Sequence, residues 1–136
     1  MVVNEGYKAI LNLLSTEKSS VAKVQVAFST SVVPPTLEDT ATEYLQGTVG
    51  LIDVDLAQIQ VSEDTTKYPF MLTAAFMNGN TLTDAALLID NKLIARLILE
   101  DPIEKTSSVV MSGYFILQAT RTENTVLSVS DMIAAS

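Results

Sequence analysis

The sequence predicts a mainly β protein, with antiparallel sheets in a β-sandwich-like or barrel-like arrangement and one N-terminal α-helix. Apolar and polar residues alternate with a period of two over several segments, which is the pattern of half-buried strands. Short polar stretches rich in Pro, Gly, Asn and Asp separate these segments. The hydrophobic content of 48% includes only 6% aromatic residues, so aliphatic side chains dominate, as suits tightly layered sheets.

No long charged or Pro/Gly-rich stretch divides the 136 residues, so we expect one structural domain, 1–136. Within this domain we expect a helix at about 4–18, a strand-rich body at 21–120 and a C-terminal strand or arm at 121–136.

The helix is predicted from Tyr7, Ile10, Leu11 and Leu14, whose spacing of three and four residues places them on one face. Asn4 is a suitable N-cap. The apolar face either packs on the chain's own sheet or docks on a neighbouring subunit, and the sequence leaves both readings open.

The first core strand is expected from Val21 onward, because Val24, Val26 and Phe28 alternate with polar or small residues. Proline lacks an amide donor and restricts the residue before it. Pro34-Pro35, followed by the polar run Thr36–Glu43, therefore predicts a surface loop.

The clearest local prediction is a hairpin of Ala85–Ile89 and Leu93–Leu99 around the polar turn Asp90-Asn91-Lys92. Gly113 is a candidate bulge site in a later strand, and Val126–Ser136 is a further strand or an arm. The other elements follow from the same patterns: strands over Gly50–Val61, Tyr68–Met77 and Val109–Thr120, and turns or loops over Ser62–Thr66, Asn78–Asn80 and Asp101–Ser107.

The composition argues against several classes of function. The chain has no cysteine and no histidine, which removes the thiolate ligand, the cysteine nucleophile and the commonest general base. It has no G-x-S-x-G or phosphate-binding glycine motif. We therefore expect no enzyme activity, no catalytic residue and no cofactor.

The formal net charge of −8 repels phosphate backbones and anionic membranes, so we expect neither nucleic-acid nor membrane binding. The apolar residues form no run long enough to span a bilayer, and MVVNEGYK lacks the features of a signal peptide. We therefore expect the chain to be made in the cytoplasm.

Two groups of charged residues are candidate sites. Asp53 and Asp55 lie two apart, so on a strand they share one face, but nothing in the sequence supplies the further oxygens that a calcium ion needs. We expect a solvated or interface face there and no metal.

Arg96 lies inside an apolar run, where an inward-facing charge is costly unless it is paired. We expect it on the polar face or beside a carboxylate, with Asp84 or Glu104 as its partner. Together with Lys105, these residues are candidates for a salt bridge that holds the hairpin or a neighbouring subunit. A merely solvated charged loop is the alternative.

The order of features around the hairpin is more specific than a general strand pattern. Asn78-Gly79-Asn80-Thr81-Leu82-Thr83-Asp84 precedes the first strand, Leu93-Ile94-Ala95-Arg96 opens the second, and Pro102-Ile103-Glu104-Lys105 follows. This order resembles the N-terminal, particle-attached modules of phage tail-fibre, collar and baseplate-associated proteins. The strand Val24–Phe28, the Pro34-Pro35-Thr36 loop and Thr40-Ala41 are similar to the opening of the same modules.

The resemblance implies a virion structural protein of the tail, neck, collar or baseplate that connects or attaches other tail components or fibres. Its implied partners are other phage structural proteins and copies of itself, as a trimer or hexamer. Because no long shaft follows, a connector, collar component or adaptor is the expected kind. A capsid decoration protein and a receptor-binding or carbohydrate-binding module are the alternatives, although the latter would display aromatic residues for sugar stacking.

Overall fold

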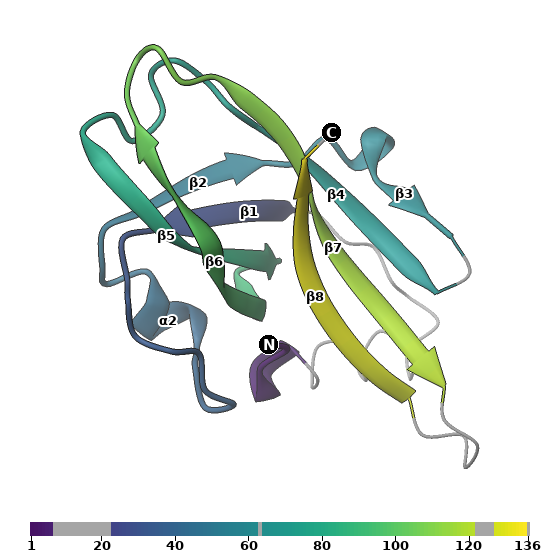
Figure 1. The fold of residues 1–136 in the computed structure, drawn as a ribbon. Helices are drawn as coiled ribbons and strands as arrows, with labels where there is room; N and C mark the ends of the chain where they lie inside the picture. The colour runs from purple at the N-terminus through teal and green to yellow at the C-terminus, as the bar shows by residue number, and fades with distance from the viewer. Residues whose placement is uncertain (7–22, 63, 122–126, 136) are drawn as a thin grey trace.

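The computed structural model describes residues 1–6, 23–62, 64–121 and 127–135. Two four-stranded sheets make up the fold, with the strand orders β2-β1-β5-β6 and β3-β4-β7-β8. All the strand pairs are antiparallel. The sheets face each other as two layers (Figure 1) and do not close into a barrel. The predicted mainly β, sandwich-like fold is therefore confirmed, and the barrel-like alternative is wrong.

The first sheet contains the central hairpin and its two neighbours. Its strands are β1 (Val24–Ser29), β2 (Val49–Asp53), β5 (Asn80–Ile89) and β6 (Lys92–Lys105). The second sheet contains β3 (Gln60–Val61), β4 (Thr65–Leu72), β7 (Met111–Arg121) and β8 (Leu127–Ala135). The short helix α2 (Ala41–Tyr44) connects β1 to β2 within the first sheet, and a 3-10 turn η1 (Leu56–Gln58) lies between β2 and β3, where the chain passes to the second sheet.

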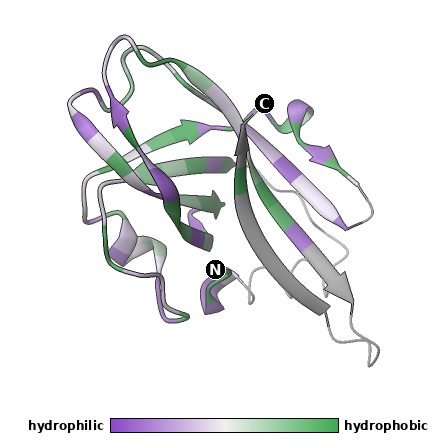
Figure 2. Cartoon of the chain, in the orientation of Figure 1, coloured by the Kyte–Doolittle hydropathy of each residue, from purple (hydrophilic) through white to green (hydrophobic). Residues whose placement is uncertain are grey.

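The main core lies between the two sheets. Val24, Val26 and Phe28 of β1 are buried there, as their alternation predicts, and Figure 2 shows the apolar character of this strand. The ring of Phe28 meets that of Phe70 edge to face, with centroids 5.1 Å apart. Such pairs contribute about 0.5–1.5 kcal/mol beyond the area that they bury.

The central hairpin is present as predicted. Ile89 pairs with Lys92, so Asp90 and Asn91 form a two-residue turn in which both have positive φ, 48° and 66°. Two positive φ angles are the signature of a type I′ turn, whose twist matches that of the flanking strands. Asp and Asn tolerate this conformation better than other non-glycine residues.

Three predicted boundaries are wrong. The strand predicted over Gly50–Val61 ends at Asp53, because Asp55 caps the turn η1 by accepting a hydrogen bond from the Ala57 amide at 3.0 Å. The strand predicted over Tyr68–Met77 runs instead over Thr65–Leu72. The loop predicted over Thr36–Glu43 leads into the helix α2, with Thr40 as its N-cap.

The loop predicted over Asp101–Ser107 is also wrong, because β6 continues to Lys105. Leu82 pairs with Ile103 and Asp84 with Ile98, so four residues of β6, Leu99–Pro102, lie opposite Thr83 alone. A proline is tolerated in such a bulge since it removes no ladder hydrogen bond. Gly113, in contrast, lies in regular register between Phe70 and Ala135 and forms no bulge.

The outer face of the first sheet is covered, and this gives the domain a second, smaller core. Val3, Ala41 and Tyr44 pack there on outward-facing residues of β1, β5 and β6: Ala27, Ala86, Leu88 and Leu93. Val2 forms a bridge with Ala95, so the N-terminal segment also lies along the edge of β6. The helix predicted over 4–18 begins at Asn4, and its residues 7–18 lie outside the described part of the chain.

The C-terminal segment, predicted as a strand or an arm, is the strand β8, which pairs with β7 from Leu127 to Ala135. Among the residues described by the structure, no helix has the length and apolarity needed to cross a membrane.

Candidate subunit-binding site

Arg96 lies on the outer face of the first sheet, beneath the loop 30–39, and is only 5% exposed. Its Nε donates to Asp84 Oδ2 at 2.6 Å, and Nη1 donates to Asp39 Oδ2 at 2.9 Å. Its Nη2 donates to Ser31 Oγ at 3.1 Å and to the Val33 carbonyl. One guanidinium group therefore joins the sheet to three positions of the loop, an arrangement that the rigid fork of arginine makes feasible.

Asp84 is fully buried and accepts two further hydrogen bonds. Its Oδ1 accepts from the Tyr44 hydroxyl at 2.7 Å and from Ser29 Oγ at 2.9 Å. The Arg96 guanidinium also lies over the Tyr44 ring, 5.7 Å from its centroid. Every carboxylate oxygen of Asp84 thus has a donor, which is the condition for keeping a buried charge.

Burial and pairing act in opposite directions on the ionisable groups here. Burial raises the pKa of Asp84, and the hydrogen bonds from Tyr44 and Arg96 offset only part of that rise. Burial also raises the pKa of Asp39, but the hydrogen bonds from Thr36 and Arg96 outweigh it, so the net shift is downward. Burial lowers the pKa of Arg96, and its two carboxylate partners more than reverse this effect. The guanidinium therefore stays charged.

Burial likewise raises the pKa of the Tyr44 phenol, and the neighbouring Asp84 carboxylate raises it further. The phenol is therefore neutral and acts as a hydrogen-bond donor. A buried network of this kind, in which every group is satisfied, is a rigid unit. In the described part of the chain, no buried side-chain nitrogen or oxygen lacks a hydrogen-bond partner.

The loop above Arg96 presents apolar side chains to solvent. Val32 is 76% exposed, Val33 62% and Leu37 45%. The backbone of this loop is held on both sides of the valines: Thr83 Oγ1 donates to the Ser31 carbonyl at 2.6 Å, and the Asn4 amide donates to the Leu37 carbonyl at 2.8 Å. The exposed valines therefore lie on a loop whose backbone is held by hydrogen bonds from Thr83 of β5 and from Asn4 of the N-terminal segment.

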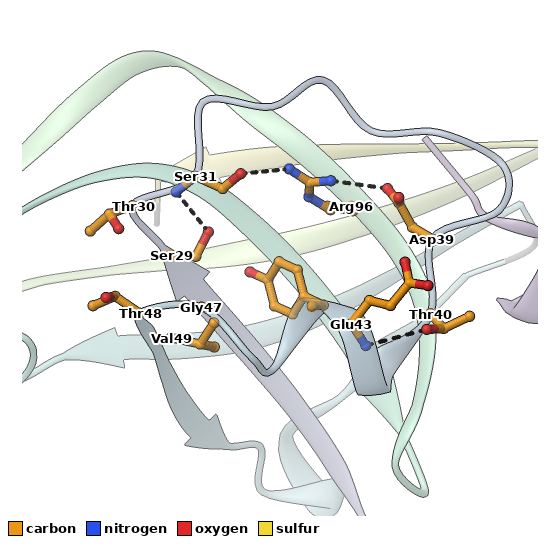
Figure 3. A pocket seen from close by; sticks show the side chains of 11 residues that line it. Ser29, Thr30, Ser31, Asp39, Thr40, Glu43, Gly47, Thr48, Val49 and Arg96 are labelled. Carbon is orange, nitrogen blue, oxygen red and sulfur yellow. Dashed lines mark hydrogen bonds and ion pairs between the residues drawn. The ribbon is translucent and has the colours of Figure 1, made fainter.

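A hollow of about 240 Å³ lies beside this network, between the loop and the helix α2. Figure 3 shows the Arg96 side chain between Ser31 and Asp39, with Glu43 and Thr40 on the helix side. Arg96 bonds to both Ser31 and Asp39 on the wall of this hollow, so the hollow directly adjoins the network.

The predicted pair of Arg96 with Asp84 is present, and Glu104 is not the partner of Arg96. Glu104 is exposed and pairs across the hairpin with Thr81. Lys105 is 1% exposed, and its ammonium group donates to Asn78 Oδ1 at 3.0 Å and to the Thr106 carbonyl at 2.8 Å. Lys105 thus secures the distal end of the hairpin through hydrogen bonds. A contact of any of these residues with another subunit stays a prediction.

Asp53 and Asp55 do not share the face of one strand. Asp53 ends β2 and accepts from Gln25 Nε2 at 3.0 Å, whereas Asp55 caps η1. Among the described residues, no group of three or more acidic side chains is placed to hold a metal ion.

Sequence reasoning did not identify Asp39, Tyr44, Ser29 and Ser31 as members of the Arg96 network. The sequence carries a local signal for Asp39 alone among these four. Its Oδ2 accepts a hydrogen bond from the Thr36 amide at 2.9 Å, in a turn of the kind that the pattern Thr-x-x-Asp can form. The other three reach Arg96 and Asp84 through pairings between distant parts of the chain, which periodicity does not record.

No family model, no curated protein and no solved structure matches this chain.

Proposed function

We propose that this chain is a structural subunit of a bacteriophage particle, in the tail, neck, collar or baseplate, and that it attaches or connects other components. The observation that carries the proposal is the loop 30–37, which displays Val32 and Val33 at 76% and 62% exposure while the buried Arg96 holds its backbone. Large apolar side chains that are held rigidly in solvent are typical of protein–protein contacts. The order of features from Asn78 to Lys105, which resembles particle-attached phage modules, supports the setting.

The arrangement suits assembly because binding costs conformational entropy when a loop must be ordered on contact. Here intramolecular hydrogen bonds already order the loop, so more of the energy of burying the valines is available to the interface. Full burial of a valine side chain is worth on the order of 1.5 kcal/mol or more. Several copies in a symmetric ring multiply this contribution, and we propose a trimer or hexamer.

The location is tested with an antibody raised against the chain and applied, with gold label, to purified particles of the phage that encodes it. Label at the tail, neck or baseplate supports the proposal. Label over the head would favour a decoration protein instead. Absence of label from both intact and disrupted particles would refute any role in the virion.

The role of the loop is tested with Val32→Asp and with Val61→Asp as the matched control. Val61 has the same exposure of 76% but lies on β3, in the other sheet. We expect both variants to fold with wild-type circular dichroism, and only V32D to lose incorporation into particles. Equal incorporation of V32D and V61D would exclude the loop as the contact surface.

A further inference from the structure

A second surface lies where strands of the first sheet meet β4 and β7 of the second sheet. One hollow of about 620 Å³ lies between β2 and β4, and another of about 470 Å³ lies between β6 and β7. They share the lining residues Phe70, Ser112 and Gly113, so they lie next to each other across β4 and β7 and are together called the groove. Both volumes are in the range of sites that accept side chains or small ligands.

Apolar groups form the floor of this groove. Phe28, Leu99 and Ile103 line the second hollow, and Ile52 lines the first. Gly113 lines both hollows and pairs with Phe70 in regular register. Two methionines border the groove, Met71 in the first hollow at 54% exposure and Met111 in the second at 36%. Methionine adapts its shape to a bound partner, and exposed methionines are common on binding surfaces.

The rim of the groove is negatively charged on both sides. Asp53 and Asp55 line the first hollow, and Glu100 and Asp101 line the second. All four are exposed, and the described lining residues include no lysine or arginine. Glu100 and Asp101 are carried outward by the bulge of β6 at Leu99–Pro102. The carboxylates therefore flank an apolar floor, and a described cation beside it, Lys67, lies over the ring of Tyr114 in the first hollow.

We propose that this groove binds a basic, amphipathic segment of a neighbouring assembly protein. Apolar side chains of the segment enter the hollows, and its lysine or arginine residues meet the carboxylates on the rim. Charge complementarity selects the partner and speeds the encounter, while burial of the anchors supplies most of the affinity. The proposal takes its setting from the function proposed above, but it concerns a different surface from the loop 30–37.

The proposal is tested by fluorescence anisotropy with a labelled peptide that alternates leucine with lysine, against a control peptide with glutamate in place of lysine. The variant is Glu100→Gln with Asp101→Asn. Its matched control, Glu38→Gln with Glu43→Gln, removes the same charge from exposed residues outside the groove. A third variant, Met111→Ser, changes the apolar border without changing the charge.

We expect the lysine peptide to bind, with an affinity that falls as salt rises, and the glutamate peptide not to bind. The groove variant should bind about 2- to 30-fold more weakly, from the usual range for two partly exposed charge pairs, and M111S should also weaken binding. Equal losses in the groove and control variants would show attraction by net charge alone and would overturn the proposal. Absence of binding by the lysine peptide, or equal binding of both peptides, would also overturn it. None of these results would alter the labelling of particles, so failure here is distinguishable from failure of the proposed function.

Discussion

Replacement of Arg96 by methionine tests whether the buried network holds the domain together. Methionine keeps the length of the aliphatic stem and removes the charge. The change breaks the ion pairs of 2.6 Å to Asp84 and 2.9 Å to Asp39 and leaves Asp84 buried. Removal of one partner of a buried pair costs about 3–5 kcal/mol.

The Tyr44 hydroxyl and Ser29 Oγ continue to donate to Asp84, so we expect the lower end of that range, about 3 kcal/mol. For a domain of this size the loss corresponds to a fall in Tm of roughly 10 °C. Urea unfolding and calorimetry measure both quantities. Lys67→Met is the matched control, because Lys67 is half-exposed and lies over the Tyr114 ring, and we expect it to cost less than about 1 kcal/mol.

The penalty of Arg96→Met should depend on pH, with a sign that follows from the carboxylates. Without the guanidinium, the pKa of Asp84 rises further above its unfolded value, so the variant loses stability as pH rises through that interval. In the wild type, the pKa of Asp39 is lower in the folded than in the unfolded protein, so its ionised carboxylate stabilises the fold. This stabilisation is present above the pKa of the unfolded protein and is lost as pH falls through the pKa of the folded protein. The Asp84 effect makes the difference between wild type and variant larger at pH 7 than at pH 4, and the Asp39 effect reduces the difference mainly below pH 4. A difference of less than about 1 kcal/mol at pH 7, or the same difference at both pH values, would refute the reasoning.

Three further substitutions test other contacts. Tyr44→Phe removes a donor to buried Asp84 and should cost about 1–3 kcal/mol in urea unfolding; an unchanged midpoint would show that water replaces the phenol. Gly6→Ala places a Cβ against the backbone carbonyl of Ile94, which cannot yield, so amide hydrogen exchange at Val3 and Arg96 should accelerate, and unchanged protection would contradict this close approach. Gly50→Ala brings a Cβ within 2.6 Å of Met77 Sδ and Phe76 Cζ and should cost about 1–3 kcal/mol, whereas Gly47→Ala, with Tyr44 O at 3.8 Å as its nearest neighbour, serves as the control.

The strands that could be predicted from the sequence are those in which apolar and polar residues alternate and in which residues that favour a turn mark the end. Val24, Val26 and Phe28 are buried as their spacing requires, and Asp90-Asn91 supplies the turn that its neighbours need. The prediction failed beyond Asp53, where Val54 and Leu56 continue the period of two but Asp55 bonds to the Ala57 amide and turns the chain. Local side-chain bonds of aspartate compete with strand pairing, and hydrophobic periodicity does not detect them.

The end of β6 was mispredicted for a related reason. Asp101-Pro102 has the local chemistry of a loop, yet the sheet accommodates both residues in a bulge opposite Thr83 and continues to Lys105. Arg96 could be placed beside a carboxylate, Asp84 or Glu104, because a charge within an apolar run must be paired, and the structure selects Asp84. Asp39, 57 residues away from it along the chain, could not be found in this way, since no local rule links a loop carboxylate to a distant strand.

The network around Arg96 raises the question of why a charged cluster occupies a site that apolar residues could fill. Buried ion pairs replaced by apolar residues of similar volume often leave stability unchanged or increase it, so stability alone does not account for the cluster. Its particular effect is positional, because Arg96 also binds the Val33 carbonyl and Asp39 on the loop that carries the exposed valines. An apolar pair can fill the space but cannot hold those two groups.

A double variant, Arg96→Met with Asp84→Leu, separates the two roles. We expect it to regain part of the stability that Arg96→Met loses, because no unpaired carboxylate stays buried, while the Tyr44 hydroxyl and Ser29 Oγ lose their acceptor. Hydrogen exchange at the amides of Ser31 and Val33 should nevertheless be faster than in the wild type, because the guanidinium no longer holds the loop, and we expect incorporation into particles to fail. If the double variant is stable, keeps wild-type protection in the loop and incorporates normally, the loop does not depend on Arg96 for its geometry, and the cluster has no positional role in binding.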